Sequence, residues 1–190
     1  FDQYCRQTFL DNVLRGGLPL QLANSSSVFH IYGRKHGDLE RDYNNFVVQP
    51  EYFSQGNANY RDVNQNRRND VCFYPQIGSA NIHTFMDLIQ LDGYNPLILR
   101  GSQFTLPVTD QETLTRQFPA FSGLQLFLQK PFTPGSLALF LQQQAHSAQD
   151  VSALWYDIWQ KAQQQRLAQH GEGYWIDHWS YNLDQIEAYL

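Results

Sequence analysis

The clearest helical pattern in the chain is the stretch 147–170, SAQDVSALWYDIWQKAQQQRLAQH, which is followed by Gly171. Ser147 is a good N-cap, because its hydroxyl can accept a hydrogen bond from the first turn of a helix. Apolar residues then recur at helical spacing, with glutamines and charges opposite them: Val151, Leu154, Trp155, Ile158, Trp159 and Ala162. Because glycine often ends a helix, the stretch predicts one amphipathic helix stopping at Gly171. A mainly α fold is expected.

Other segments support that fold class. Apolar residues at helical spacing, or a favourable first turn such as Thr133-Pro134, predict helices at 1–14, 79–92, 110–118, 133–144 and 177–190. Ser79 is the expected N-cap of the second, and Gly93 its stop. The short apolar runs Val28–Tyr32 and Phe46–Val48 predict strands or buried extended loops.

Composition excludes several classes of protein. The chain has 190 residues, 42% of them hydrophobic, a net charge of -5 and only 13 Lys and Arg, which argues against disorder and against nucleic-acid binding. No apolar run approaches the roughly 18 to 20 residues that a membrane-crossing helix needs. Cys5 and Cys72 lack zinc-site or disulfide-framework spacing. We therefore expect a cytoplasmic protein with no membrane partner, no metal and no cofactor.

The most polar region is a long loop, 33–70, which shows little periodicity. Within it, the run from Tyr60 to Asp70 concentrates guanidinium, carboxylate and amide groups, which match adjacent sugar hydroxyls. Nearby aromatic rings could stack on the apolar face of a pyranose. The run thus indicates saccharide recognition, with Arg61 and Asp62 foremost. The alternative is a solvated loop whose Arg and Asp side chains tie the backbone together.

Arg61, Arg67 and Arg68 are the densest basic spot of this acidic chain, and arginine suits bidentate phosphate contacts. Phosphate is therefore a second candidate ligand. The alternative is that these arginines form salt bridges with Asp62 and Asp70.

Asp177 lies at the expected start of the last helix, between Trp175 and His178. It could cap that helix, face a pocket, or do both. His36, His83 and His178 show no ligand or triad spacing, and His83 is expected at the surface or in packing. No serine or cysteine nucleophile motif is present.

The stretch 52–66, YFSQGNANYRDVNQN, resembles the glycine-rich loop and Arg-Asp-x-x-Gln segment of inverting carbohydrate phosphorylases. These are the cellobiose and chitobiose phosphorylases, including longer cellobiose-phosphorylase-like relatives. The segments 79–93 and 175–183 are similar to the inner helix after that loop and to the start of the next one. The resemblance covers mainly 45–95 and 173–190, and it departs at Asn66, where the family usually has an acidic residue.

For the fold, the resemblance implies part of an (α/α)6-type toroid with long ordered loops and a few short strands. The expected organisation is a linker helix and leading segment (1–32), the first part of the toroid with the sugar-binding loop (33–96), a helical insertion (97–170) and the start of a truncated inner helix (171–190).

For the activity, the resemblance implies reversible inverting phosphorolysis of a glucosidic bond, in which phosphate takes the place of the base-activated water of an inverting hydrolase. Phosphate is then a co-substrate, and the partners are an oligosaccharide and the remainder of the same polypeptide. The expected sugar-binding residues are Arg61, Asp62, Gln65, Asp177, Tyr60 and Trp175, and the expected phosphate-binding residues are Arg67 and Arg68. The general acid is expected downstream, so no catalytic residue is assigned here.

Two other functions fit the same residues. One is an inverting glycoside hydrolase on the same fold, which would need a second carboxylate roughly 6.5 to 9.5 Å from the acid. The other is a non-catalytic saccharide-binding or scaffold module.

Overall fold

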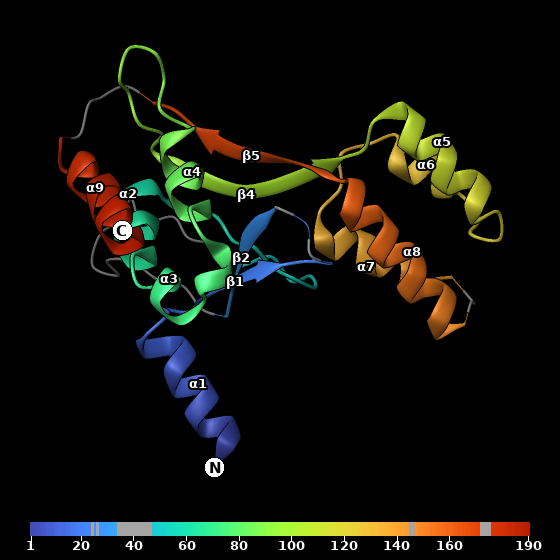
Figure 1. Ribbon diagram of the computed structural model, residues 1–190, viewed down its shortest axis with the longest axis horizontal. Coiled ribbons are helices and arrows are strands. Elements are labelled where there is room, and N and C mark those ends of the chain that lie inside the picture. The colour runs from blue at the N-terminus through green and yellow to red at the C-terminus, as the bar shows by residue number, and fades with distance from the viewer. Residues whose placement is uncertain (24, 26, 34–46, 145–146, 172–175) are drawn as a thin grey trace.

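The computed structural model describes residues 1–23, 25, 27–33, 47–144, 147–171 and 176–190. A long antiparallel ribbon of two strands, β4 (Ile98–Thr105) and β5 (Gln163–Gln169), joins two bodies of the molecule (Figure 1). More of the described residues lie in helices than in strands, which confirms the mainly α prediction. Besides the helices, the described residues form two small antiparallel sheets. The described elements do not form a ring of paired helices, so the toroid expected from the resemblance is not seen.

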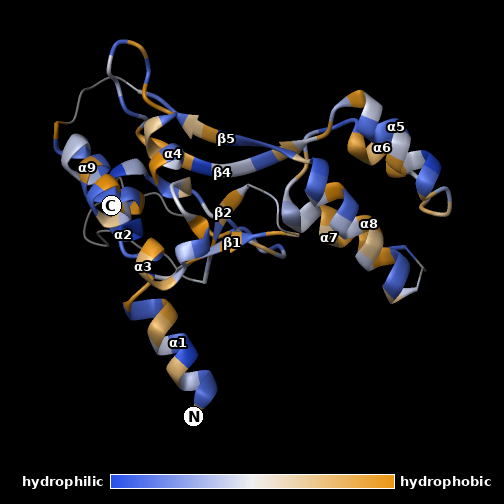
Figure 2. Cartoon of the chain, in the orientation of Figure 1, coloured by the Kyte–Doolittle hydropathy of each residue, from blue (hydrophilic) through white to orange (hydrophobic). Residues whose placement is uncertain are grey.

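The helix predicted for 147–170 is wrong in its second half, which forms strand β5. The helix α8 (Ala148–Lys161) begins as expected, with the Ser147 hydroxyl accepting from the backbone N–H of Asp150 at 3.2 Å. At Ala162 the backbone becomes extended (ψ 132°), and the glutamine-rich residues that follow pair with β4. Glutamine is a good helix former, but intrinsic helix propensity is small, and here the pairing of backbone groups between strands overrides it. Hydrophilic residues line much of both strands (Figure 2).

The first body contains the N-terminal half of the chain and the C-terminal helix. The helix α1 (Asp2–Asn12) projects from it and buries no residue, whereas β1 (Gly17–Gln21) and β2 (Val28–Tyr32) form a hairpin with Gly17 opposite Tyr32 (Figure 1). The strand prediction for 28–32 is thus confirmed. Of 46–48, Val47 forms an isolated bridge with Asn57, and Phe46 lies outside the described residues.

Short helices follow the two-residue strand β3 (Ala58–Asn59). They are α2 (Tyr60–Arg67), α3 (Asp70–Phe73), the 3-10 helix η1 (Pro75–Ile77) and α4 (Ala80–Met86), and the C-terminal helix α9 (Asp177–Tyr189) packs across α2 and α4. The helix predicted to reach Asp92 therefore ends six residues early. Its N-cap is Ser79, as predicted, but the hydroxyl makes no capping bond. The chain turns after α4, where Gln90 donates its backbone N–H to Tyr94 at 3.0 Å.

The second body consists of α5 (Val108–Gln117), α6 (Leu124–Leu128), α7 (Pro134–Gln142) and α8. The predicted start of α7 is confirmed, because Thr133 and Ser136 form a reciprocal capping box. The main hydrophobic core fills this body and includes Phe104, Phe132 and Trp159. The segment 97–170, expected as a helical insertion, thus carries the expected helices between two strands that the sequence did not predict.

None of the helices in the described part of the chain combines the length and the apolar character needed to cross a membrane.

Candidate functional site

The N-terminus of α2 carries the residues singled out from the sequence, and its backbone is held on two sides. The Asn59 side chain caps the helix by accepting a hydrogen bond from the backbone N–H of Arg61 at 3.0 Å. The backbone N–H of Tyr60 donates to the carbonyl of Leu97 at 2.9 Å. These bonds fix the start of the helix, and with it the positions of Arg61 and Asp62.

Three of the predicted sugar-binding residues lie together, and we refer to Arg61, Asp62 and Asp177 as the Arg61 cluster. Nε of Arg61 lies 3.3 Å from Oδ1 of Asp62, and one of its terminal nitrogens lies 3.9 Å from Oδ2 of Asp177. The side chains of Arg61 and Asp177 are 25% and 42% exposed, so the cluster opens to solvent. Asp177 is the first residue of α9 and Ile176 is its N-cap, so the prediction that Asp177 caps the helix is wrong.

Asp62 is the buried member of the Arg61 cluster, with a side chain only 6% exposed. Its Oδ1 accepts the hydrogen bond from Arg61, whereas its buried Oδ2 has no hydrogen-bond partner among the described residues. A buried polar atom without a partner costs free energy, about 1–3 kcal/mol and more for a charged group. This oxygen is therefore an unmet hydrogen-bond acceptor next to the solvent-exposed part of the Arg61 cluster.

His178 lies behind the Arg61 cluster, with its ring 5.2 Å from that of Tyr60. Burial lowers the pKa of His178, although the neighbouring Asp177 carboxylate acts in the opposite direction. The imidazole is therefore neutral at pH 7, and it adds no positive charge beside Arg61.

Tyr60, expected to contact sugar, is instead fully buried in the core of the first body. Its hydroxyl donates to the carbonyl oxygen of Phe85 at 2.8 Å and lies 3.1 Å from Oδ1 of Asn182. Burial raises the pKa of Tyr60, so the phenol stays protonated. The Tyr60 side chain thus links α2 to α4 and α9.

Buried amides continue that contact between α2 and α9. Nδ2 of Asn64 donates to Oδ1 of Asn182 at 2.6 Å, and Nε2 of Gln185 donates to the backbone carbonyl of Asn64 at 2.7 Å. Sequence reasoning missed this network, because its partners lie 118 and 121 positions apart. It joins α2 to α9 at Asn64, Asn182 and Gln185.

Arg67, expected to bind phosphate, is fully buried and its guanidinium is occupied by protein groups. Its two terminal nitrogens donate to the carbonyl oxygens of Gly17 and Leu14, and one of them lies 3.6 Å from Oδ1 of Asp70. A side chain at Gly17 would collide with this guanidinium. The salt-bridge alternative therefore holds for Arg67, which joins α2 to the β1–β2 hairpin.

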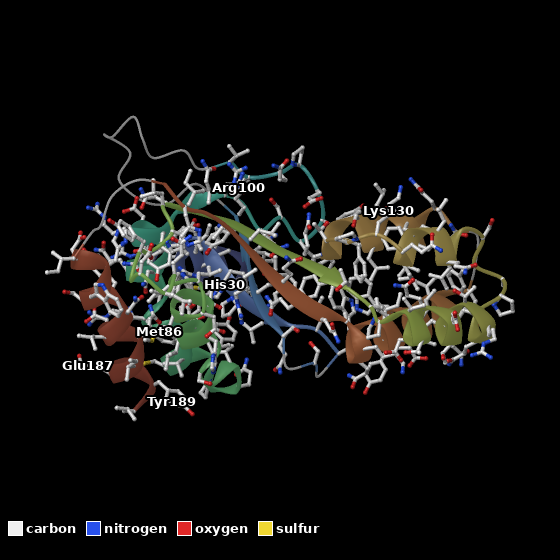
Figure 3. The ribbon with its side chains drawn as sticks, turned by 90° about the horizontal axis from the view of Figure 1, so that it is seen from above. His30, Met86, Arg100, Lys130, Glu187 and Tyr189 are labelled. Atoms are coloured by element: carbon white, nitrogen blue, oxygen red, sulfur yellow. The ribbon has the colours of Figure 1, made fainter. Side chains whose placement is uncertain are left out.

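Asp70, considered above as a salt-bridge partner of the arginines, completes a buried polar cluster, and we refer to His30, Arg67, Asp70 and Asn81 as the Arg67 cluster. Oδ2 of Asp70 lies 2.8 Å from Nε2 of His30 and accepts from Nδ2 of Asn81 at 3.1 Å. Burial lowers the pKa of His30 even though Asp70 acts to raise it. Figure 3 places His30 inside the first body. Arg67 and Asp70 are three residues apart, whereas His30 and Asn81 are distant from Asp70 in sequence, so no local pattern predicts that they join it.

Gln65, on α2, and Arg68, the residue that follows this helix, lie in an open depression of about 340 Å³ that we call the arginine depression. Arg68 pairs with Asp184 at 3.4 Å across it. The sequence did not suggest Arg15, which contributes a second guanidinium from a backbone with φ of 51°. The residues that line it are Arg15, Gln65, Asn66, Arg68, Asn69, Tyr181 and Asp184.

The remaining residues singled out from the sequence are either exposed or outside the described part of the chain. Trp175 and His36 lie outside the described residues. His83 is exposed, as predicted, and Cys5 and Cys72 are exposed free thiols. In the part of the chain that the structure describes, no group of three or more His, Cys, Asp or Glu side chains is placed to hold a metal ion.

Comparison of this chain with family models, with curated proteins and with solved structures finds no match.

Proposed function

We propose that this chain is part of a carbohydrate-active enzyme that cleaves a glucosidic bond by reversible inverting phosphorolysis, and that the Arg61 cluster binds the donor sugar. The observation that carries the proposal is the buried, unpartnered Oδ2 of Asp62 beside Arg61 and Asp177. A ligand that donates a hydrogen bond to this oxygen would remove the free-energy cost of leaving it without a partner. Sugar hydroxyls donate and accept together, which suits a guanidinium between two carboxylates.

The proposed division of labour follows from the position of each group. Asp62 accepts from a sugar hydroxyl, Arg61 donates to a neighbouring oxygen, and the more exposed Asp177 contacts the sugar at the solvent side. Neutral His178 keeps the local charge at two carboxylates and one guanidinium. The net charge of the cluster is negative, which favours a neutral sugar over an anion at this position.

Phosphate is proposed to bind farther along α2, in the arginine depression, with Arg68 and Arg15 as its cationic groups. Arg61 and Arg68 are seven residues apart, which is about 10 Å along a helix at 1.5 Å per residue. Gln65 lies between them on the same side of α2. Arg67 is not part of this proposal, because its guanidinium is buried and engaged.

The wider features of the resemblance belong to the same proposal. The packing of α9 across α2 and α4 is consistent with a helical toroid completed by further chain, which would also supply the general acid. A cytoplasmic location is proposed with it.

The proposal is tested with the complete enzyme of which this chain is proposed to be a part. Purified enzyme is incubated with cellobiose and related disaccharides, with and without inorganic phosphate, and sugar 1-phosphate is measured. Formation of sugar 1-phosphate only when phosphate is present is the expected result. Release of free sugar without phosphate would instead identify an inverting hydrolase, and no turnover with any sugar would leave a binding module.

The role of Asp62 is tested by Asp62→Asn in the same assay. We expect kcat/KM to fall more than about tenfold, because a charge-assisted hydrogen bond is worth about 1.5–3 kcal/mol. Asp2→Asn, at an exposed position on α1, is the matched control. Unchanged kinetics in Asp62→Asn would remove this carboxylate from the site.

A further inference from the structure

A separate polar depression lies where residues 49–57 pass the ribbon β4–β5, and it shares no residue with the Arg61 cluster. It is open to solvent and has a volume of about 250 Å³. Figure 3 labels Arg100, on β4, at this side of the molecule. We call it the amide depression, and the polar side chains on which the argument rests are Gln49, Glu51, Asn57, Arg100 and Gln103.

One wall of the amide depression is fixed to β4 by a pair of hydrogen bonds. Nε2 of Gln55 donates to the carbonyl of Ser102 at 2.8 Å, and Oε1 accepts from the N–H of the same residue at 2.8 Å. The strand bulges here, between Leu99 and Ser102, and Gly101 has a φ of +73°. A Cβ at Gly101 would lie 3.0 Å from Cβ of Gln55, so the bulge lets the wall come this close.

The other end of the same wall is held by the start of α7. A Cβ at Gly135 would collide with the backbone carbonyl of Tyr52 and would lie 3.1 Å from Cδ of Glu51. The Glu51 carboxylate thus sits beside the N-terminal turn of α7, where a negative charge is favoured. Because both ends of the wall are fixed, the depression is formed before any ligand arrives.

The groups that face the amide depression have unused hydrogen-bonding capacity. The side chains of Gln49, Glu51, Asn57 and Gln103 make no hydrogen bond within the described part of the chain, whereas Arg100 donates to Gln169. One carboxylate and one guanidinium balance in charge, so neither an anion nor a cation is favoured. Three neutral amides between them can each donate and accept.

We propose that the amide depression binds one unit of an uncharged oligosaccharide. Its chemistry matches a ligand that carries many hydroxyls and no charge, and its volume is just below the roughly 300–1,000 Å³ of sites that enclose a whole small ligand. It therefore takes part of a longer molecule. The inference adds a second sugar-binding position to the proposed function, and only the choice of a glucose-based probe rests on that function.

The test uses cellotetraose and the 190-residue chain, followed by two-dimensional amide NMR. Saturable shifts of the side-chain amides of Gln49, Asn57 and Gln103 are expected. In Glu51→Gln the affinity measured from these shifts should fall about tenfold or more, because a charge-assisted contact is lost. Glu112→Gln, at an exposed position on α5, is the matched control and should bind as the unchanged chain does.

The outcomes separate this inference from the proposed function. If the three amides shift in Asp62→Asn as in the unchanged chain but weaken in Glu51→Gln, the amide depression is a site of its own. If shifts occur only near Arg61 and are lost only in Asp62→Asn, the inference is overturned while the proposed sugar site stands. No saturable shift of the three amides, or equal affinity in Glu51→Gln and the unchanged chain, also overturns it.

Discussion

The Arg61 cluster and the Arg67 cluster each pair an arginine of α2 with aspartate, yet they differ in what surrounds them. Arg67 and Asp70 are fully buried and contact two carbonyls, a histidine and an asparagine, although Nε of Arg67 and Oδ1 of Asp70 have no hydrogen-bond partner among the described residues. Arg61 and Asp177 reach solvent, and one oxygen of Asp62 is buried with no partner. An Arg-Asp pair enclosed by protein joins segments of the fold, whereas a pair whose arginine reaches solvent can meet a ligand.

The largest expected difference between the clusters is in stability. Arg67→Met removes the guanidinium but keeps the apolar stem, and it leaves Asp70 buried without its cation. We expect a loss of about 3–5 kcal/mol in the free energy of unfolding, or no cooperative unfolding transition at all. Arg61→Met should lose less than about 2 kcal/mol, because water reaches that cluster.

Both variants are measured by urea unfolding followed by circular dichroism. Equal losses in the two variants would show that the clusters do not differ as proposed.

A second difference is in the response to pH, and it concerns His30 in the Arg67 cluster. Burial holds the pKa of His30 below its ordinary 6.5 in the folded protein, so folding favours the neutral ring. This contribution to stability is complete above pH 6.5, and it declines as the pH falls below that value towards the folded pKa. The slope attributable to His30 reaches up to about 1.4 kcal/mol per pH unit.

We expect His30→Gln to flatten the dependence of unfolding free energy on pH below 6.5, although His178, whose pKa is also lowered, retains its own share. His83→Gln, at an exposed position, is the control and should leave the slope unchanged. The slope is obtained from urea unfolding at several pH values. An unaltered slope in His30→Gln would mean that this ring takes up its proton equally well in both states.

The smallest expected effect lies in the arginine depression. Arg68 and Asp184 are 56% and 34% exposed, and their nitrogen and oxygen are 3.4 Å apart. An exposed pair of this kind contributes little, so Arg68→Ala should change the free energy of unfolding by no more than about 0.5 kcal/mol. A double-mutant cycle with Asp184→Ala measures the coupling. A coupling well above 1 kcal/mol would place this pair with the structural ion pairs and weaken its proposed part in phosphate binding.

Local signals in the sequence predicted the helices well where a cap and an apolar face agreed. The starts of α7 and α8 follow from Thr133 and Ser147, and α9 follows from its spacing of apolar residues. The ribbon was missed because a glutamine-rich strand has no alternating pattern to reveal it. Its strand character comes from pairing with β4, some 60 residues earlier in the chain.

The candidate site was predictable to a similar degree. Proximity of Arg61 and Asp62 follows from adjacency, and the place of Asp177 beside them was expected from the resemblance. The buried positions of Tyr60 and Arg67 depend on partners such as Asn182 and Leu14, which are distant in sequence. The spacing of residues on one helix cannot tell whether a side chain meets water or another segment.

The pairing of Thr105 with Gln163 has a topological consequence for the second body. The chain leaves β4 after Thr105 and enters β5 at Gln163, its direct cross-strand neighbour. The 57 residues between them, 106–162, therefore form an insertion whose two ends are adjacent. A short turn could in principle close the same two strands. Evolution could therefore have lengthened this insertion, or exchanged it, without altering the path of the chain around the Arg61 cluster.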